Sequence, residues 1–377
     1  MIYLDNSATT KPEKAVADKV YELLCDKFGN PSSFHRAGLD ANAEVKNARS
    51  IIAKELSCEE EEVFFTSGGT EANNLAVFGA AQALKRRGKR IVTTAIEHES
   101  VLEAVSELEK QGFEVIRLEP DKSGNIEGRQ LLEAINEDTI LVSMMYVNNE
   151  VGSVLPVSAV QKAVKRAGAP ALIHIDCVQA FGKIPVKPKK LGADLVSVTA
   201  HKLHGPKGVG ALYIKKGVRI IPRQYGGAQE RKIRPGTEAS PLIAGFGKAV
   251  EMLPDYKEQS VKAHELNLYA KSELEKIDGV IFNSPENASD YIINLYVPSF
   301  MTSQTIVQHL SSRYDICVSS GSACAKGKKS HVLTAMRLDD KTIEHSIRVS
   351  FSRNTEKSDI DALVKALNET VKNYPKG

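Results

Sequence analysis

The chain has 377 residues, of which 42% are hydrophobic and 26% are charged, and this ordinary composition excludes a disordered or fibrous chain. At roughly 150 residues per domain, the length predicts two or three structural units. The formal net charge of +3 gives no indication of direct nucleic-acid binding. There is no run of about 18 apolar residues and no secretory leader, so we expect a cytoplasmic protein without a membrane partner.

Over the first 255 residues, short apolar runs that predict strands alternate with amphipathic segments that predict helices. The expected strands are 62–66, 90–94, 113–118, 140–147, 171–176, 194–199 and 210–214. Helices are expected at 70–87, 100–111 and 157–167, and Gly88 and Gly112 are stop signals for two of them. Several strands are apolar on both faces, which is typical of a parallel sheet covered by helices. We therefore expect an α/β fold, with a large domain at 14–255 built on a mainly parallel seven-stranded sheet.

The pattern changes after about residue 255. A long charged helix is expected at 257–277, with further helices at 303–313 and 357–373 and strands at 280–282, 291–296, 316–319 and 346–351. This mixture predicts a smaller α+β domain, formed by residues 1–13 and 256–377.

Five scattered cysteines stand at positions 25, 58, 177, 317 and 324. The odd number and the absence of C-x-x-C spacing argue against a disulfide framework and against a zinc site, so we expect no metal. We expect reduced thiols, of which one or more could react.

The candidate ligand-binding residues directly follow predicted strands, where ligands bind in open α/β sheets. The run 67–71, with Gly68, Gly69 and Thr70, lies between a strand and a helix. Close backbone approach, free helix N–H groups and the Thr70 hydroxyl could together hold a phosphate. The alternative is a tight turn in which Thr70 caps the helix.

Two charged residues stand at the ends of later strands. Lys202 lies at the mouth of the expected buried sheet, where desolvation frees an amine for a Schiff base; a solvated surface lysine is the alternative. Asp176 could keep a pyridinium nitrogen protonated or could cap a helix. A phosphate cradle, a Schiff-base lysine and a strand-end carboxylate are together what pyridoxal 5′-phosphate (PLP) requires.

A series of motifs extends this pattern along nearly the whole chain. They are YLDNSATT (3–10), GNPSSFH (29–35), SGGTE (67–71), EHES (97–100), NNEVG (148–152), DCVQ (176–179), HK (201–202), RPGT (234–237), SSGSAC (319–324) and IRVS (347–350). With these motifs the chain resembles the NifS-like cysteine desulfurases, in the class V aminotransferase branch of the fold-type I PLP-dependent enzymes.

The resemblance implies a role for each matching residue. Lys202 would carry the cofactor and move the substrate Cα proton, His98 would stack on the ring and take part in acid–base steps, and Asp176 would hold the ring nitrogen. The remaining cofactor contacts would come from Gly69, Thr70, Asn149, Gln179, Thr199, His201 and Thr237. Among these, Gln179 and Asn149 would face the ring oxygen, and Thr70, Thr199 and His201 the phosphate.

The resemblance also implies partners and products. Thr237 would reach the phosphate in the neighbouring subunit, which implies a homodimer with shared active sites. Arg348 and Asn149 would bind the carboxylate of L-cysteine, and Cys324 would take the sulfur as a persulfide and leave L-alanine. The sulfur would then pass to an acceptor protein, either an iron–sulfur scaffold or a sulfurtransferase of tRNA or thiamin thiolation.

Cys324 lies in a run of small residues within a loop at about 319–331, which we expect to be mobile. Lys326, Lys328 and Lys329 follow it, and nearby cations favour a thiolate; a solvated charge run is the alternative. We expect this basic run to contribute to thiolate formation and to acceptor choice.

The sequence departs from the family pattern in two places. Thr199 stands where many members carry serine, which keeps a hydroxyl. The segment 325–330 is shorter than in relatives that serve iron–sulfur scaffolds and lacks their Leu-Glu-Pro motif, so the acceptor stays open. A selenocysteine lyase, a PLP aminotransferase and a catalytically silent scaffold of the same fold are the competing hypotheses; a mobile Cys324 argues against the aminotransferase.

Overall fold

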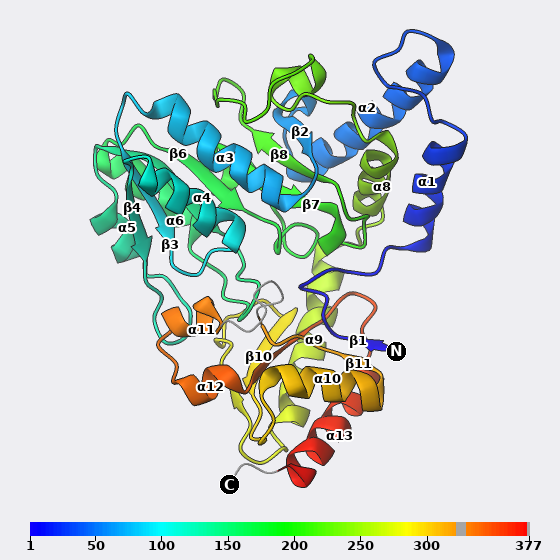
Figure 1. Ribbon diagram of the computed structural model, residues 1–377, viewed down its shortest axis with the longest axis vertical. Coiled ribbons are helices and arrows are strands. Elements are labelled where there is room, and N and C mark those ends of the chain that lie inside the picture. The colour runs from blue at the N-terminus through cyan, green and yellow to red at the C-terminus, as the bar shows by residue number, and fades with distance from the viewer. Residues whose placement is uncertain (322–328, 375–377) are drawn as a thin grey trace.

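The computed structural model describes residues 1–321 and 329–374 (Figure 1). A seven-stranded sheet forms the centre of the larger part, in the order β2-β8-β7-β6-β5-β3-β4. Its strands are β2 (Val63–Thr66), β3 (Arg90–Thr94), β4 (Glu114–Leu118), β5 (Thr139–Met145), β6 (Leu172–Asp176), β7 (Leu195–Thr199) and β8 (Gly210–Ile214). Strand β8 runs antiparallel to both of its neighbours, and the other pairs are parallel. The predicted mainly parallel seven-stranded sheet is confirmed.

Helices cover both faces of this sheet. They are α1 (Lys14–Cys25), α2 (Arg36–Leu56), α3 (Gly69–Leu84), α4 (Glu99–Lys110), α5 (Gly128–Ala134), α6 (Val157–Ala167), α7 (Pro188–Leu191) and α8 (Ser240–Glu251). Successive strand residues enter different cores: Val63 and Phe65 pack with α2 and α8, whereas Phe64 packs with α3 and α4. This alternation explains why central strands such as β5 and β8 are buried along their whole length.

The smaller part lies at the bottom of Figure 1 and holds two short sheets. Strands β9 (Ile281–Phe282), β10 (Ile292–Tyr296) and β12 (Ser346–Ser350) are antiparallel, whereas β1 (Ile2–Tyr3) and β11 (Ile316–Cys317) are parallel. The helices here are α9 (Tyr256–Leu274), α10 (Ser303–Tyr314), α11 (His331–Ala335), α12 (Asp340–Glu344) and α13 (Lys357–Asn373). The expected α+β mixture is confirmed, and the N-terminus does lie beside this part.

The two parts share apolar packing. Val332 and Leu333 of α11 belong to the core of the large sheet, whereas α9, α10 and α13 pack with β10 and β12 around a core of their own. The domain boundaries at residues 13 and 255 stay a prediction. Within the ranges that the structure describes, no helix is both long enough and apolar enough to span a bilayer.

Candidate active site

The candidate site is a pocket of about 290 Å³, lined by the last residues of β5, β6 and β7. It therefore lies at the carboxyl edge of the sheet, as expected for an open α/β fold. Ten of the residues predicted from sequence line it: Gly69, Thr70, His98, Asn149, Asp176, Gln179, Thr199, His201, Lys202 and Arg348. Thr237 is exposed and is not among the lining residues, and Cys324 lies outside the described residues.

One end of the pocket is suited to an anion. Helix α3 begins at Gly69, so its first N–H groups have no partner within the helix. A Cβ on Gly69 would lie 2.8 Å from the Val178 Cγ2 atom, so glycine is what lets the backbone fit at this wall. Burial and neighbouring positive charges lower the pKa of His201 to about 3, which keeps its imidazole neutral. The Thr199 hydroxyl donates to the Val209 carbonyl at 3.1 Å.

Asp176 ends β6 and is buried. Its carboxylate accepts from the Val178 N–H at 2.9 Å and from the Asn73 amide at 2.7 Å. Both donors are neutral, and no cation among the described residues lies within ion-pair distance. Burial raises the pKa of Asp176 above its usual range, although the two hydrogen bonds, His98 and Lys202 act the other way. The carboxylate is thus fixed in place without being neutralised.

His98 caps α4 and is tied to Asp176 through two side chains. Its Nδ1 accepts from the Ser100 N–H at 3.1 Å, so a neutral ring carries its proton on Nε2. Burial lowers the pKa of His98, which favours that neutral form. Ser100 Oγ lies 2.9 Å from His98 Nδ1 and accepts from Asn73, which also holds Asp176. The two groups expected at the cofactor ring are therefore joined by one hydrogen-bonded chain.

Lys202 follows β7 and reaches across to the N-terminal segment. Its amine donates to the carbonyls of Ser7 and Ala8. The side-chain amide of Gln179 donates to the same Ser7 carbonyl at 2.8 Å. The Tyr3 hydroxyl donates to the Thr9 carbonyl at 2.9 Å. Together these hydrogen bonds hold the N-terminal segment against the side of the pocket that Lys202 and Gln179 form.

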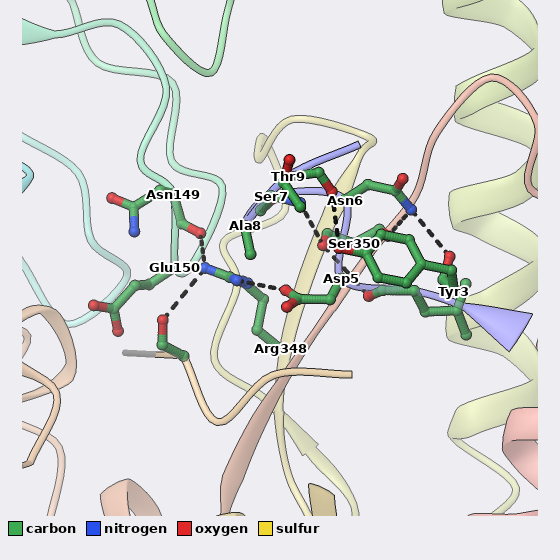
Figure 2. A network of polar contacts seen from close by, with 12 residues as sticks. Tyr3, Asp5, Asn6, Ser7, Ala8, Thr9, Asn149, Glu150, Arg348 and Ser350 are labelled. Carbon is green, nitrogen blue, oxygen red and sulfur yellow. Dashed lines mark hydrogen bonds and ion pairs between the residues drawn. The ribbon is translucent and has the colours of Figure 1, made fainter. Parts of the chain in front are cut away.

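Arg348 faces the pocket from β12 and is only 2% exposed. Figure 2 shows its guanidinium between Asn149 and Asp5: one Nη donates to the Asn149 carbonyl at 2.8 Å and the other to Asp5 at 2.7 Å. The first Nη also lies 3.3 Å from the Gly321 carbonyl, and Nε has no partner. Hydrogen bonds of Asn6 and Ser7 to Ser350 hold Asp5 beside β12. Arg348 is thus preorganised as a binding site for a carboxylate.

The described residues that flank Cys324 also reach this region. Gly321 and His331 both line the pocket, and His331 Nε2 bonds to the Glu97 carbonyl at 2.9 Å. Lys329 pairs with Asp340 at 2.8 Å and lies 3.6 Å from Glu344. Its charge is therefore partly compensated, which weakens the expected contribution of this lysine to thiolate formation. Lys326 and Lys328 lie outside the described residues.

Comparison with known proteins identifies the family. The aminotransferase class-V family model matches residues 2–363. The cysteine desulfurase IscS of Dictyoglomus turgidum is 40% identical over 375 residues, covering 98% of this chain and 94% of the relative. The chain belongs to the NifS-like cysteine desulfurases. The solved structure of a NifS-like protein is 36% identical, with a TM-score of 0.91 over 99% of each chain. A second structure, described as SspA in complex with cysteine, is 33% identical with a TM-score of 0.82, covering 93% of this chain and 99% of that one.

Membership among the cysteine desulfurases confirms the expected family, its fold and its enzyme class, and it implies PLP as the cofactor. Sequence reasoning nevertheless missed parts of the site. Asn73 lies one turn after Gly69 on α3, and this spacing could have revealed it. Ser7 and Ala8 act through backbone carbonyls, which leave no signal in side-chain chemistry. Glu97 is fully buried, which raises its pKa to about 8, and its acidic residue type would have suggested a surface position.

Proposed function

We propose that this cysteine desulfurase removes the sulfur of L-cysteine with PLP bound in the 290 Å³ pocket, and that it leaves L-alanine and a persulfide on Cys324. When bound, the cofactor supplies an aldehyde for amines and a ring that accepts the electrons released at Cα. One observation carries the proposal: Lys202, Asp176, His98 and Arg348, each from a separate element, meet at one pocket.

The described residues fit this cofactor. Glycine at position 69 lets the start of α3 pack against Val178, and the N–H groups at this helix start would hold the phosphate. Asp176 is a buried carboxylate that forms no ion pair among the described residues, and a protonated ring nitrogen would supply a partner. Asn73 Oδ1, buried and without a partner, keeps an acceptor free beside that carboxylate. Thr70, Thr199 and His201 would hold the phosphate, and Gln179 and Asn149 would face the ring oxygen.

Arg348, Lys202 and His98 have separate roles in this reaction. Arg348 binds the substrate carboxylate, for which its planar guanidinium is suited. The Lys202 amine takes the proton from the substrate Cα, a step for which its pKa must be low enough to leave it uncharged. His98 covers the ring and, as a neutral imidazole, can exchange a proton at Nε2.

Cys324 performs the sulfur transfer. Its thiolate forms a bond to the substrate sulfur while the bond between that sulfur and carbon breaks, and protonation of the carbon then gives alanine. The positions of Gly321 and His331 at the pocket support this role, because the chain enters and leaves the Cys324 run beside the site.

The test is to incubate the cofactor-loaded protein with L-cysteine and to measure alanine, and sulfide with a reductant. We expect wild type to form both, Cys324→Ala to keep the cofactor and lose sulfur transfer, and Lys202→Ala to lose the visible cofactor band and turnover. Cys25→Ala, at an exposed thiol, is the matched control and should behave as wild type. Wild type that forms no alanine, or Cys324→Ala that transfers sulfur normally, would contradict the proposal.

We further propose a cytoplasmic homodimer with shared active sites, supported by the exposed position of Thr237 away from its own pocket. Mixing inactive Lys202→Ala with Thr237→Ala should restore activity, because one site of the hybrid then has both residues; no recovery would contradict a shared site. The sulfur acceptor is an iron–sulfur scaffold or a sulfurtransferase of tRNA or thiamin thiolation, and persulfide transfer to purified candidates distinguishes them.

A further inference from the structure

A buried lysine, Lys183, lies close to the pocket residues Gln179 and Lys202. Lys183 is 7% exposed, and no carboxylate among the described residues lies within ion-pair distance of it. Burying an amine without an acidic partner is costly, and lysine is among the residue types least often found in a protein interior. We therefore expect the contacts of Lys183 to serve a function that offsets the cost of burying its amine.

The main contact of Lys183 is with a pocket residue. Its Nζ donates to Gln179 Oε1 at 3.1 Å and lies 5.6 Å from the centre of the Tyr291 ring. An amide whose oxygen is held in this way must direct its nitrogen to the other side, where Gln179 Nε2 donates to the Ser7 carbonyl. Turning the amide over would place two donors against each other. Lys183 therefore fixes which group Gln179 presents.

Lys183 is also linked to Lys202. Lys202 donates directly to the Ser7 carbonyl, and Lys183 is connected to the same carbonyl through the Gln179 amide. Both residues also line a small cavity of about 20 Å³, which is room for a single water molecule. A cation near an amine favours the uncharged form of that amine, and this arrangement is a known way to activate a Schiff-base lysine.

The groups that surround Lys183 are basic or neutral. His201, His204 and Lys202 approach from the segment after β7, Tyr291 precedes β10, Arg348 lies on β12, and Arg353 follows β12. Burial, together with Lys202 and Arg348, lowers the pKa of Lys183 to about 7. The amine is therefore close to losing its charge at neutral pH, and the charge matters most below that pH.

We propose that Lys183 is a positioning residue of the active site: it holds the Gln179 amide with its N–H groups toward the cofactor side, and it helps to keep the Lys202 amine uncharged. The inference rests on the proposed function, because it assumes that PLP occupies the pocket and is carried by Lys202. It adds a residue that touches neither the cofactor nor the substrate.

The experiment uses the full chain, loaded with PLP or stripped of it. Two quantities are measured: the dissociation constant for PLP rebinding to the stripped chain, and the pH at which the visible band of the loaded chain changes. Lys183→Met removes the amine and keeps most of the apolar stem. Lys183→Gln keeps a hydrogen-bond donor without the charge. Lys110→Met, at an exposed lysine paired with Glu107, is the matched control.

For Lys183→Met we expect the dissociation constant to rise about tenfold, which corresponds to one lost hydrogen bond. Its band transition should move to higher pH by on the order of one pH unit, since a neighbouring cation is gone. Lys183→Gln should recover most of the affinity and keep the pH shift, and Lys110→Met should change neither quantity.

Unchanged affinity and an unchanged transition in Lys183→Met would overturn the inference, as would a transition that moves to lower pH. If Lys183→Met does not fold, Lys183→Gln decides: a transition at the wild-type pH overturns the electrostatic link to Lys202. A wild-type chain that neither rebinds PLP nor shows a visible band would refute the proposed function itself, so the two failures are distinguishable.

Discussion

Two buried charged residues line the pocket, one at the sheet and one on β12, and they differ in their partners. Asp176, at the end of β6, is held by the neutral donors of Val178 and Asn73. Arg348, on β12, is paired with the carboxylate of Asp5 at 2.7 Å. Among the residues that the structure describes, the carboxylate on the sheet side of the pocket therefore has no ion-pair partner, whereas the arginine on the β12 side is already paired.

The different pairing of Asp176 and Arg348 determines how much binding free energy each side can gain from its ligand. An unpaired buried carboxylate is unfavourable until a cation arrives, so the Asp176 side gains strongly from a positively charged ring nitrogen. The Arg348 side has less to gain, because a substrate carboxylate must share the guanidinium with Asp5. The strong gain at Asp176 suits a cofactor that stays bound, and the smaller gain at Arg348 suits a substrate that enters and leaves at each turnover.

The largest expected effect comes from neutralising the sheet side. We expect Asp176→Asn to lower kcat for alanine formation about a thousandfold, since losing one partner of a buried charge pair costs roughly 3–5 kcal/mol. The stripped variant should unfold at the same or a higher temperature than wild type, because Asn73 can turn its unpartnered Oδ1 toward the new amide. Kinetics and thermal unfolding check both parts.

Asp194→Asn is the matched control for this change, since Asp194 lies just before β7 and pairs with Lys215. It should keep full activity. A stripped Asp176→Asn chain that is clearly less stable than wild type would break the comparison, because it would mean that the Asp176 charge is already compensated.

The second effect concerns the arginine side. We expect Arg348→Lys to lower kcat/KM about a hundredfold, mainly through KM, because a single ammonium cannot hold Asp5, the Asn149 carbonyl and a substrate carboxylate together. Arg90→Lys, at an arginine paired with Glu114 outside the pocket, is the control. A fall in kcat with an unchanged KM would instead place Arg348 in the chemical step.

The two sides also differ in how far sequence alone could lead. Asp176 ends one strand and Lys202 follows another, in a sheet whose seven members are visible as apolar runs, so the sheet edge and its ligand groups were predictable. Arg348 was placed by family resemblance, and its pairing with Asp5 joins residues 343 positions apart. No local pattern encodes such a contact, because it depends on how the N-terminal segment packs beside β12. The Lys202 contacts with Ser7 and Ala8 have the same origin.

A smaller effect tests that long-range pair. We expect Asp5→Asn to lower KM for L-cysteine about threefold with kcat unchanged, since the amide oxygen still accepts from Arg348 but no longer repels the substrate carboxylate. The change should shrink at high salt, because the Asp5 side chain is 20% exposed. Asp40→Asn, on the exposed face of α2, serves as control. A higher KM would show that Asp5 orients Arg348 more than it competes with the substrate.

The last prediction concerns stability rather than turnover, at Glu97, a second carboxylate on the sheet side that has no ion-pair partner among the described residues. Its Oε1 accepts from Thr94 and from the Met145 N–H, whereas the buried Oε2 has no partner. Burial raises its pKa from 4.5 to about 8. The folded chain thus binds this proton more tightly than the unfolded chain, so its contribution to stability falls as pH rises from about 4.5 to about 8, by about 1.4 kcal/mol per pH unit.

Glu97→Gln mimics the protonated acid and should remove this contribution. The stability of the stripped variant relative to wild type should therefore rise with pH across that window, as measured by urea midpoints at several pH values. Glu103→Gln, at an exposed position of α4, is the control and should show no such trend. If the difference between Glu97→Gln and wild type is constant with pH, Glu97 does not hold a proton in the folded chain, and the sheet side then carries the charge of Glu97 in addition to that of Asp176.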